Sequence, residues 1–290
     1  MPQRYASTTK VYRDEQTGEL SGLSRVRAIT QDDAHVFCRP DQVKSEMAKI
    51  WTIIETFYGA VGFTLTPRLS LHDPKEMEKY LGTEATWQKS ENELRALVKE
   101  KGAVAAEAVG EAAFYGPKVD FMGKDSIGRQ WQLATIQLDM NMPGRFELDY
   151  VNEKGEKEQV VMIHAAIMGA IERYLSIIIE HFAGAFPLWL SPVQVKILPV
   201  GEKFLSYAQT VTDELKAAGI RAELETSNET LGKKVRGAKV EKVPSWIVIG
   251  EKEENAKVFT LEKRSGEKKE GLSASALSEM LLEDIKLKKL

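Results

Sequence analysis

The feature of this sequence that most limits its fold is a change of pattern near Pro187 and Pro192. Before these prolines, short alternating segments separated by turn residues predict an antiparallel sheet with helices beside it. After them, buried strands alternate with amphipathic helices, which is typical of an α/β domain with a partly parallel sheet. The pattern predicts an α+β domain over residues 1–190 and a smaller α/β domain over residues 191–290. A chain of 290 residues is long enough for both, at roughly 100–200 residues each.

Composition excludes several classes of protein. The chain is 43% hydrophobic, which rules out global disorder, and no run of about 18 apolar residues predicts a membrane span. We also expect no secretory signal at the N-terminus. Cys38 is the only cysteine, so a disulfide framework is excluded and a reducing compartment, the cytoplasm, is expected. The net charge of −3 predicts that any nucleic acid is bound by local basic patches and not by bulk charge.

In the first domain, two strands flank the polar segment YRDEQTGELSG and predict an antiparallel hairpin. Further strands are expected over residues 63–71, 113–122, 129–139 and 146–151, the last three as a meander. Pro67 suggests that the first of these strands is an edge or contains a bulge. Residues 102–113 are small and acidic, and we expect a loop there.

Helical spacing of apolar residues predicts the remaining elements. In the first domain, helices are expected over residues 40–59, 74–100 and 161–186, the last of them strongly apolar. In the second domain, strands are expected at VQVKILPV, IRAELE, SWIVIG and KVFTLEK, and helices over residues 202–218, 229–239 and 273–287.

Charged residues at the ends of the hairpin loop form the first candidate site. Arg13 and Glu15 lie at its entrance and Arg25 at its exit. Guanidinium groups match phosphate and carboxylate geometry bidentately, although a solvated charged hairpin is the alternative. Arg173 follows Glu172 in an apolar helix, where an arginine is costly to bury unless it is paired or binds an anion. A buried structural ion pair between these two residues is the alternative there.

Polar residues on otherwise apolar strands form the second candidate site. Strand alternation puts Gln31, Asp33 and His35 on one face, which suggests a polar pocket. Imidazole suits zinc, and His35 can meet His164 in space, but no third ligand is evident. The alternative is that His35 makes its hydrogen bonds within the protein, beside an exposed acidic strand, and binds no ligand. Further polar side chains on the strands are Tyr115, Gln132 and Gln137. The alternative, equally compatible with the sequence, is that these are ordinary polar residues of strands without a binding role.

Together these segments resemble the class II aminoacyl-tRNA synthetases, in their threonyl-specific form. TKVYRDEQTGELSGLSRVRAITQDDAHVFC resembles motif 2, and VMIHAAIMGAIERYLSIIIEHFAGAF resembles motif 3. AFYGPKVDF, WQLATIQLDMN and RFELDYV resemble the strands between these motifs. SNETLGKKVRGAKVEKVPSWIVIGEKE is similar to the family's anticodon-binding domain. The resemblance extends over essentially the whole chain.

The resemblance implies a role for each candidate residue. ATP binding falls to Arg13, Glu15, Arg25, Gln132 and Arg173, with Arg13 and Arg173 as the catalytic groups on the phosphates. Threonine and adenylate binding falls to Gln31, Asp33, Tyr115 and Gln137, zinc binding to His35 and His164, and anticodon binding to Asn228. The implied fold is a partial class II antiparallel sheet flanked by helices, followed by the anticodon-binding domain.

The resemblance also implies an activity: a threonine–tRNA ligase that uses ATP, Mg²⁺ and Zn²⁺ to activate threonine and transfers it to tRNA(Thr). In the family, a segment ahead of motif 2 carries motif 1, which builds the homodimer, and supplies a cysteine as third zinc ligand. This sequence begins after the counterpart of that segment, so we expect an incomplete zinc site. Two alternatives stay open: a split subunit that needs an N-terminal partner fragment, and an inactive paralogue that binds tRNA or ATP.

Overall fold

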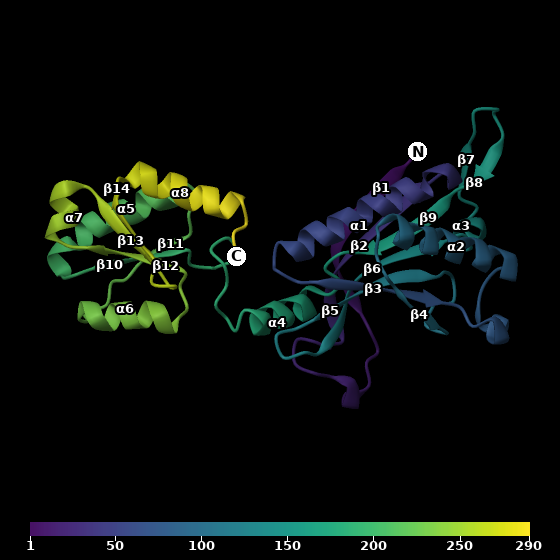
Figure 1. Cartoon of the computed structure of the whole chain (residues 1–290), viewed down its shortest axis with the longest axis horizontal. Coiled ribbons are helices and arrows are strands. Elements are labelled where there is room, and N and C mark those ends of the chain that lie inside the picture. The colour runs from purple at the N-terminus through teal and green to yellow at the C-terminus, as the bar shows by residue number, and fades with distance from the viewer. The chain divides into compact units, whose positions relative to one another are not determined.

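The structure, a computed structural model, describes all residues from 1 to 290 and divides into two compact units, Met1–His181 and Phe182–Leu290. The first contains a seven-stranded, mostly antiparallel sheet flanked by helices, and the second a five-stranded mixed sheet with helices (Figure 1). The predicted fold class, an α+β unit followed by a smaller α/β unit, is confirmed. No helix combines the length and the apolar character needed to cross a membrane.

The first sheet has the strand order β1-β2-β9-β6-β5-β3-β4. Its strands are β1 (Gln3–Tyr12), β2 (Ala28–Cys38), β3 (Leu65–Leu71), β4 (Ala106–Val109), β5 (Lys118–Lys124), β6 (Gln130–Asp139) and β9 (Val161–Ala166). All neighbouring pairs are antiparallel except β3 and β4. The predicted hairpin forms between β1 and β2, with Tyr12 opposite Ala28 at its loop end.

Two long helices, α1 (Val43–Gly59) and α2 (Glu84–Glu100), cover one face of this sheet (Figure 1). On that face, Trp51 of α1 meets Phe121 of β5 with 4.7 Å between the ring centroids. Since neighbouring strand residues point to opposite faces, the face that carries Asp120 lies away from these helices. Shorter elements complete the unit: α3 (Met142–Arg145), α4 (Ile171–His181), β7 (Asp149–Val151) and β8 (Lys157–Gln159).

Three expectations for the first unit are wrong. The segment predicted as one helix over residues 161–186 forms the central strand β9 and only then the shorter helix α4. Val161, Met162 and Ile163 are all buried, and a strand buried on both faces has the same continuous apolar run as a buried helix. The expected loop over residues 102–113 contains the edge strand β4. Strand β7 pairs with β8 in a separate hairpin instead of joining the main sheet.

The second unit has the strand order β11-β10-β12-β13-β14. Its elements are β10 (Val195–Pro199), α5 (Leu205–Ala217), β11 (Ala222–Leu224), α6 (Leu231–Val240), β12 (Ser245–Ile249), α7 (Glu251–Ala256), β13 (Phe259–Lys263), β14 (Lys268–Leu272) and α8 (Ala274–Lys286). Strand β10 is parallel to β11 and β12, whereas β13 and β14 are antiparallel. The predicted partly parallel sheet is therefore present, with α7 and β14 as additional elements.

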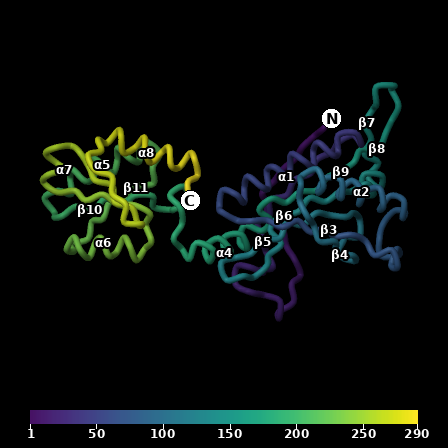
Figure 2. Tube along the Cα trace, in the orientation of Figure 1, coloured from purple at the N-terminus to yellow at the C-terminus, as the bar shows by residue number.

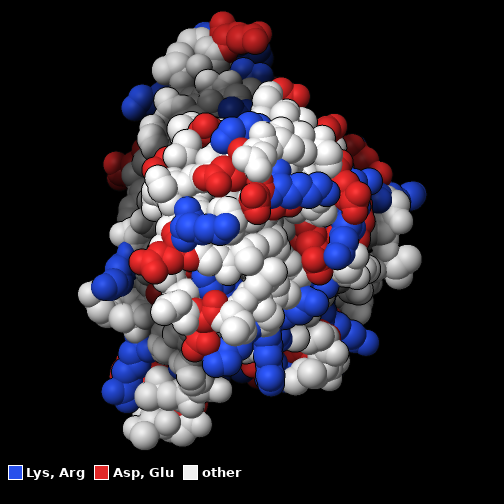
Figure 3. Space-filling view, turned by 90° about the vertical axis from the view of Figure 1, so that its left-hand side faces the viewer, with Lys and Arg blue, Asp and Glu red and all other residues white.

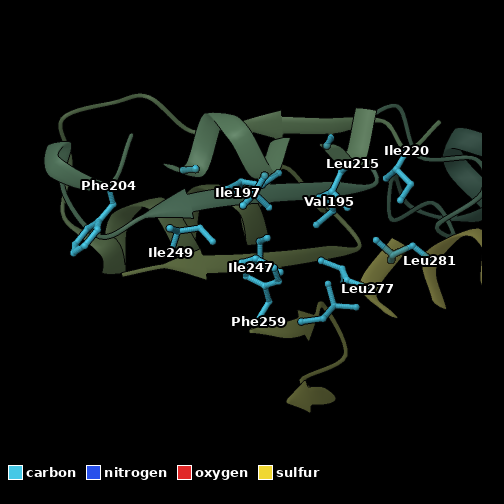
Figure 4. Packing of buried hydrophobic residues seen from close by; sticks show 14 residues of the cluster. Val195, Ile197, Phe204, Leu215, Ile220, Ile247, Ile249, Phe259, Leu277 and Leu281 are labelled. Carbon is cyan, nitrogen blue, oxygen red and sulfur yellow. The ribbon is translucent and has the colours of Figure 1, made fainter. Parts of the chain in front are cut away.

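Helices cover both faces of the second sheet, with α5 and α8 on one side and α6 on the other (Figure 2). Val195, Ile197 and Ile247 from the central strands meet Leu277 and Leu281 of α8 in one buried cluster (Figure 4). A second cluster joins residues of α6 to the opposite face. Every residue of β10 is buried, Lys196 included, so the strand packs on both sides. The second unit therefore has a hydrophobic core of its own.

Candidate active site

A cavity of about 500 Å³ opens on the face of the first sheet that α1 and α2 leave uncovered. Every first-domain residue with an expected binding role lines it: Arg13, Glu15, Arg25, Gln31, Asp33, His35, Tyr115, Gln132, Gln137, His164 and Arg173. Residues distant in the sequence thus converge on one cavity, while their individual roles stay predictions. Asn228 lies in the second unit, exposed in the loop between β11 and α6.

The two imidazoles meet because three adjacent strands are in register. His35 on β2 lies opposite His164 on β9, and His164 lies opposite Gln137 on β6. The ring centroids of the two histidines are 4.7 Å apart. The sequence suggested that His164 begins a helix, but the side chain projects from a strand in the middle of the sheet.

A buried carboxylate orients one of these rings. Nε2 of His164 lies 3.0 Å from Oδ2 of Asp139, whose other oxygen accepts hydrogen bonds from the backbone N–H groups of Asn141 and Met142, both at 2.9 Å. When Nε2 donates its proton to this carboxylate, Nδ1 keeps a free lone pair, as metal-binding histidines commonly do. Burial lowers the pKa of His35 and His164 lowers it further, against the opposing effect of Asp33.

The residues present do not complete a zinc site. A catalytic zinc normally has three protein ligands and one open position. The structure contains no group of three histidine, cysteine, aspartate or glutamate residues that can hold a metal ion. Cys38 lies three residues after His35 on β2, so its buried side chain is on the opposite face of the strand and does not complete the set. His35 and His164 therefore form two ligands of an incomplete set.

Guanidinium groups dominate the opposite end of the cavity. Nε of Arg25 lies 2.8 Å from Oε2 of Glu15, so these two charges balance each other. Nε of Arg173 instead donates to the backbone carbonyl of Ser24 at 2.8 Å. Burial lowers the pKa of Arg173, and the nearby charges of Arg13 and Arg25 lower it further, with Glu15 opposing them. A half-buried arginine beside like charges suits an anionic ligand.

Amide groups on the strands present defined hydrogen-bonding atoms to the cavity. The Tyr115 hydroxyl donates to Oε1 of Gln137 at 2.8 Å, and Nε2 of Gln137 donates to the carbonyl of Gly116 at 2.9 Å. Nε2 of Gln132 donates to Oδ1 of Asp120 at 2.7 Å. The amide nitrogen of Gln132 is therefore turned away, and its carbonyl oxygen remains available to accept a hydrogen bond from a ligand.

Several residues that shape the cavity were not recognised in the sequence. Asp120 and Asp139 are fully buried carboxylates that orient Gln132 and His164. Both belong to strands whose neighbouring residues are apolar, so an acidic residue breaking an apolar run was the available signal. The expected alternative for Glu172, an ion pair with Arg173, is wrong, because Glu172 accepts its hydrogen bonds from Thr30.

Comparisons with known families agree with this architecture. Residues 1–182 match the family model described as tRNA synthetase class II core domain (G, H, P, S and T), and residues 194–284 match the anticodon binding domain. The chain therefore belongs to the class II tRNA synthetase family.

Within that class, proteins named threonine–tRNA ligase are similar to nearly the whole chain. The threonine–tRNA ligase of Cytophaga hutchinsonii is 48% identical over 98% of the chain. That of Flavobacterium johnsoniae is 46% identical over 100% of the chain. The chain spans only 43% and 45% of the length of these two relatives. The crystal structure of the RNA binding domain of threonyl-tRNA synthetase from Cryptosporidium parvum Iowa II matches with a TM-score of 0.92 at 37% identity, over 98% of this chain and 70% of that one. The expected resemblance to threonyl-tRNA synthetases is confirmed.

Proposed function

We propose that this chain carries part of the active site of a threonine–tRNA ligase, which activates threonine with ATP and transfers it to tRNA(Thr). Residues 1–190 would form the partial catalytic domain and residues 191–290 the anticodon-binding domain. The observation that carries the proposal is the convergence of Arg13, Arg25 and Arg173 on one cavity with the His35–His164 pair. Phosphates and a small amino acid are the ligands that this combination suits.

In the proposed reaction, the threonine carboxylate attacks the α-phosphorus of ATP and pyrophosphate leaves. Negative charge grows on the phosphates, and Arg13 and Arg173 stabilise it electrostatically without any protein nucleophile. Glu15 would receive the adenine amine and Arg25 would lie near the phosphates. Mg²⁺ would enter with the nucleotide and neutralise phosphate charge, since it usually keeps few protein ligands.

The amino acid would lie at the histidine end of the cavity. Gln31 and Asp33 project there from β2, beside Tyr115 and Gln137. The Asp33 carboxylate suits an ammonium group, and the Tyr115–Gln137 hydrogen bond fixes polar atoms for a small hydroxyl side chain. Because the imidazole pair is an incomplete zinc site, no step of the proposed reaction is assigned to zinc.

The second unit would bind the tRNA anticodon. It matches the anticodon binding domain over residues 194–284, and Asn228 is exposed just ahead of α6. Acidic and basic side chains are interspersed over the face of this unit that is turned toward the viewer in Figure 3. Such a surface supports recognition by particular side chains more than attraction by bulk charge.

ATP binding tests the phosphate assignments directly. Arg13→Ala and Arg173→Ala should each weaken ATP binding by about tenfold or more, because each removes a charge-assisted contact to phosphate. Isothermal titration with ATP measures the effect. Arg145→Ala is the matched control, since Arg145 is exposed and lies outside the cavity. Unchanged ATP affinity in both cavity variants would refute the assignments.

Threonine-dependent ATP–pyrophosphate exchange distinguishes an enzyme that is active alone from a split subunit and from a non-catalytic paralogue. Exchange by the purified chain alone identifies a self-sufficient activating enzyme. Exchange only after adding the upstream part of a full-length relative identifies a split subunit. Binding of ATP or tRNA with no exchange in either assay identifies a non-catalytic paralogue.

A further inference from the structure

A carboxylate on α4 joins this helix to strand β2. Both oxygens of Glu172 accept hydrogen bonds from the backbone N–H of Thr30, at 3.0 and 2.9 Å, and Oε1 also accepts the Thr30 hydroxyl at 3.0 Å. Burial by itself raises the pKa of Glu172, but the hydrogen bonds from Thr30 and from its own backbone N–H, with the charge of Lys10, outweigh it and the net shift is downward. The group is therefore a charged, fully engaged acceptor at neutral pH.

A second carboxylate makes a similar connection two residues further along β2. Asp32 accepts hydrogen bonds from three successive backbone N–H groups, those of Ile167 at 2.8 Å, Met168 at 3.1 Å and Gly169 at 2.5 Å. The Asp32 backbone N–H donates in return to the Gly169 carbonyl at 3.2 Å. Gly169 has a φ of +71°, which glycine adopts without the penalty of a side chain. Asp32 thus fixes the turn between β9 and α4.

These two connections lie on both sides of a short segment that leads to Arg173. Asp32 holds the chain at Gly169, and Glu172 holds it three residues later. Arg173 comes next, where its charge lies near those of Arg13 and Arg25. Glu15 balances Arg25, so the remaining repulsion is chiefly between Arg173 and Arg13, and it favours their separation while no anion is bound. The carboxylate connections oppose that separation without neutralising Arg173, because their acceptors are occupied by Thr30 and by the backbone.

We propose that Glu172 and Asp32 are positioning residues that hold Arg173 in place for the polyphosphate of the nucleotide. Neither carboxylate touches the nucleotide in this role. The inference rests on the proposed function, since it requires that the cavity binds ATP. In this proposal, the hydrogen bonds of Glu172 and Asp32 raise the affinity for the polyphosphate in addition to stabilising the fold.

The test compares two ligands on the full chain by titration calorimetry, ATP and AMP. Glu172→Gln and Thr30→Val should each lower ATP affinity by about tenfold while AMP affinity changes by less than about twofold, because only the polyphosphate needs Arg173 in place. Thr30→Ser keeps the hydroxyl and is the matched control, expected to bind ATP like the parent chain. Glu172→Asp keeps the carboxylate and should lose less ATP affinity than Glu172→Gln. Asp32→Asn should lower ATP affinity about as much as Glu172→Gln does, with AMP affinity again nearly unchanged.

Thermal unfolding of each variant distinguishes positioning from simple stabilisation. Equal losses of ATP and AMP affinity that follow the fall in midpoint temperature would overturn the inference, as would parent-like ATP affinity in both Glu172→Gln and Thr30→Val. Failure of the parent chain itself to bind ATP would refute the proposed function, and the inference would fall with it.

Discussion

Among single residues, His72 is buried between two carboxylates. Its Nδ1 lies 2.6 Å from Oε1 of Glu91 and its Nε2 lies 3.1 Å from Oε2 of Glu84, with the Tyr80 ring at its edge. Burial by itself lowers the pKa of His72, but the hydrogen bonds that its ring donates to the two glutamates, together with their charges, outweigh it and the pKa is raised. The charged imidazolium therefore ties the end of β3 to α2.

This pairing predicts a pH dependence of stability. A histidine whose pKa is raised on folding contributes fully below its unfolded pKa of about 6.5, and the contribution is lost as pH rises through the folded pKa. The free energy of unfolding should therefore contain a component that declines between about pH 6.5 and the raised pKa. Urea unfolding of the parent chain and of His72→Gln measures it, and the difference between them should shrink as pH rises. A difference independent of pH would contradict the expectation.

Gly116 is a residue whose lack of a side chain is required by its neighbours. A Cβ at this position would lie 2.2 Å from the carbonyl oxygen of Leu138, a backbone atom that cannot rotate away. Gly116→Ala should destabilise the first unit by about 1–3 kcal/mol and weaken threonine binding by moving Tyr115. Gly59→Ala is the control, because its Cβ meets nothing within 4 Å and alanine favours the helix. Thermal unfolding and threonine titration of both variants test this, and parent-like stability of Gly116→Ala would contradict it.

At the scale of elements, a helix or strand could be predicted from the sequence when its own residues carry the pattern that forms it. Helix α1 and the β1–β2 hairpin carry their own signals, an apolar stripe for one and a polar turn between alternating strands for the other. Strand β9 does not, because it forms by pairing with β2 and β6, which lie in other parts of the sequence. Strand β4 is only four residues long and carries no clear alternation of apolar and polar residues, and its pairing with β3 is a tertiary event.

The candidate site divides in the same way. The alternation of Gln31, Asp33 and His35 follows from strand geometry, and all three line the cavity. Strand register brings His164 opposite His35, which the assumed helix did not imply. The role of Asp139 in orienting His164 depends on the turn after β6 and on the neighbouring strand together. A contact between two separate strands, such as the one from Asp139 to His164, leaves no pattern in the sequence of either strand alone.

At the scale of the whole molecule, the two units have separate cores, and this predicts separable stabilities. Leu277 is fully buried in the cluster of the second unit. Leu277→Ala should therefore destabilise that unit by about 2–5 kcal/mol and leave ATP affinity unchanged. Calorimetric unfolding of the full chain should show one transition shifted and the other constant. A common shift of the whole unfolding profile, or a loss of ATP affinity, would contradict independent cores.

Every wall of the cavity comes from the unit Met1–His181. The second unit can consequently diverge, be replaced by another domain or be lost in a lineage while every residue that lines the cavity is retained. Under the proposed function, selection on the nucleotide pocket and selection on tRNA recognition would act on different stretches of the same gene, and the two could change at different rates.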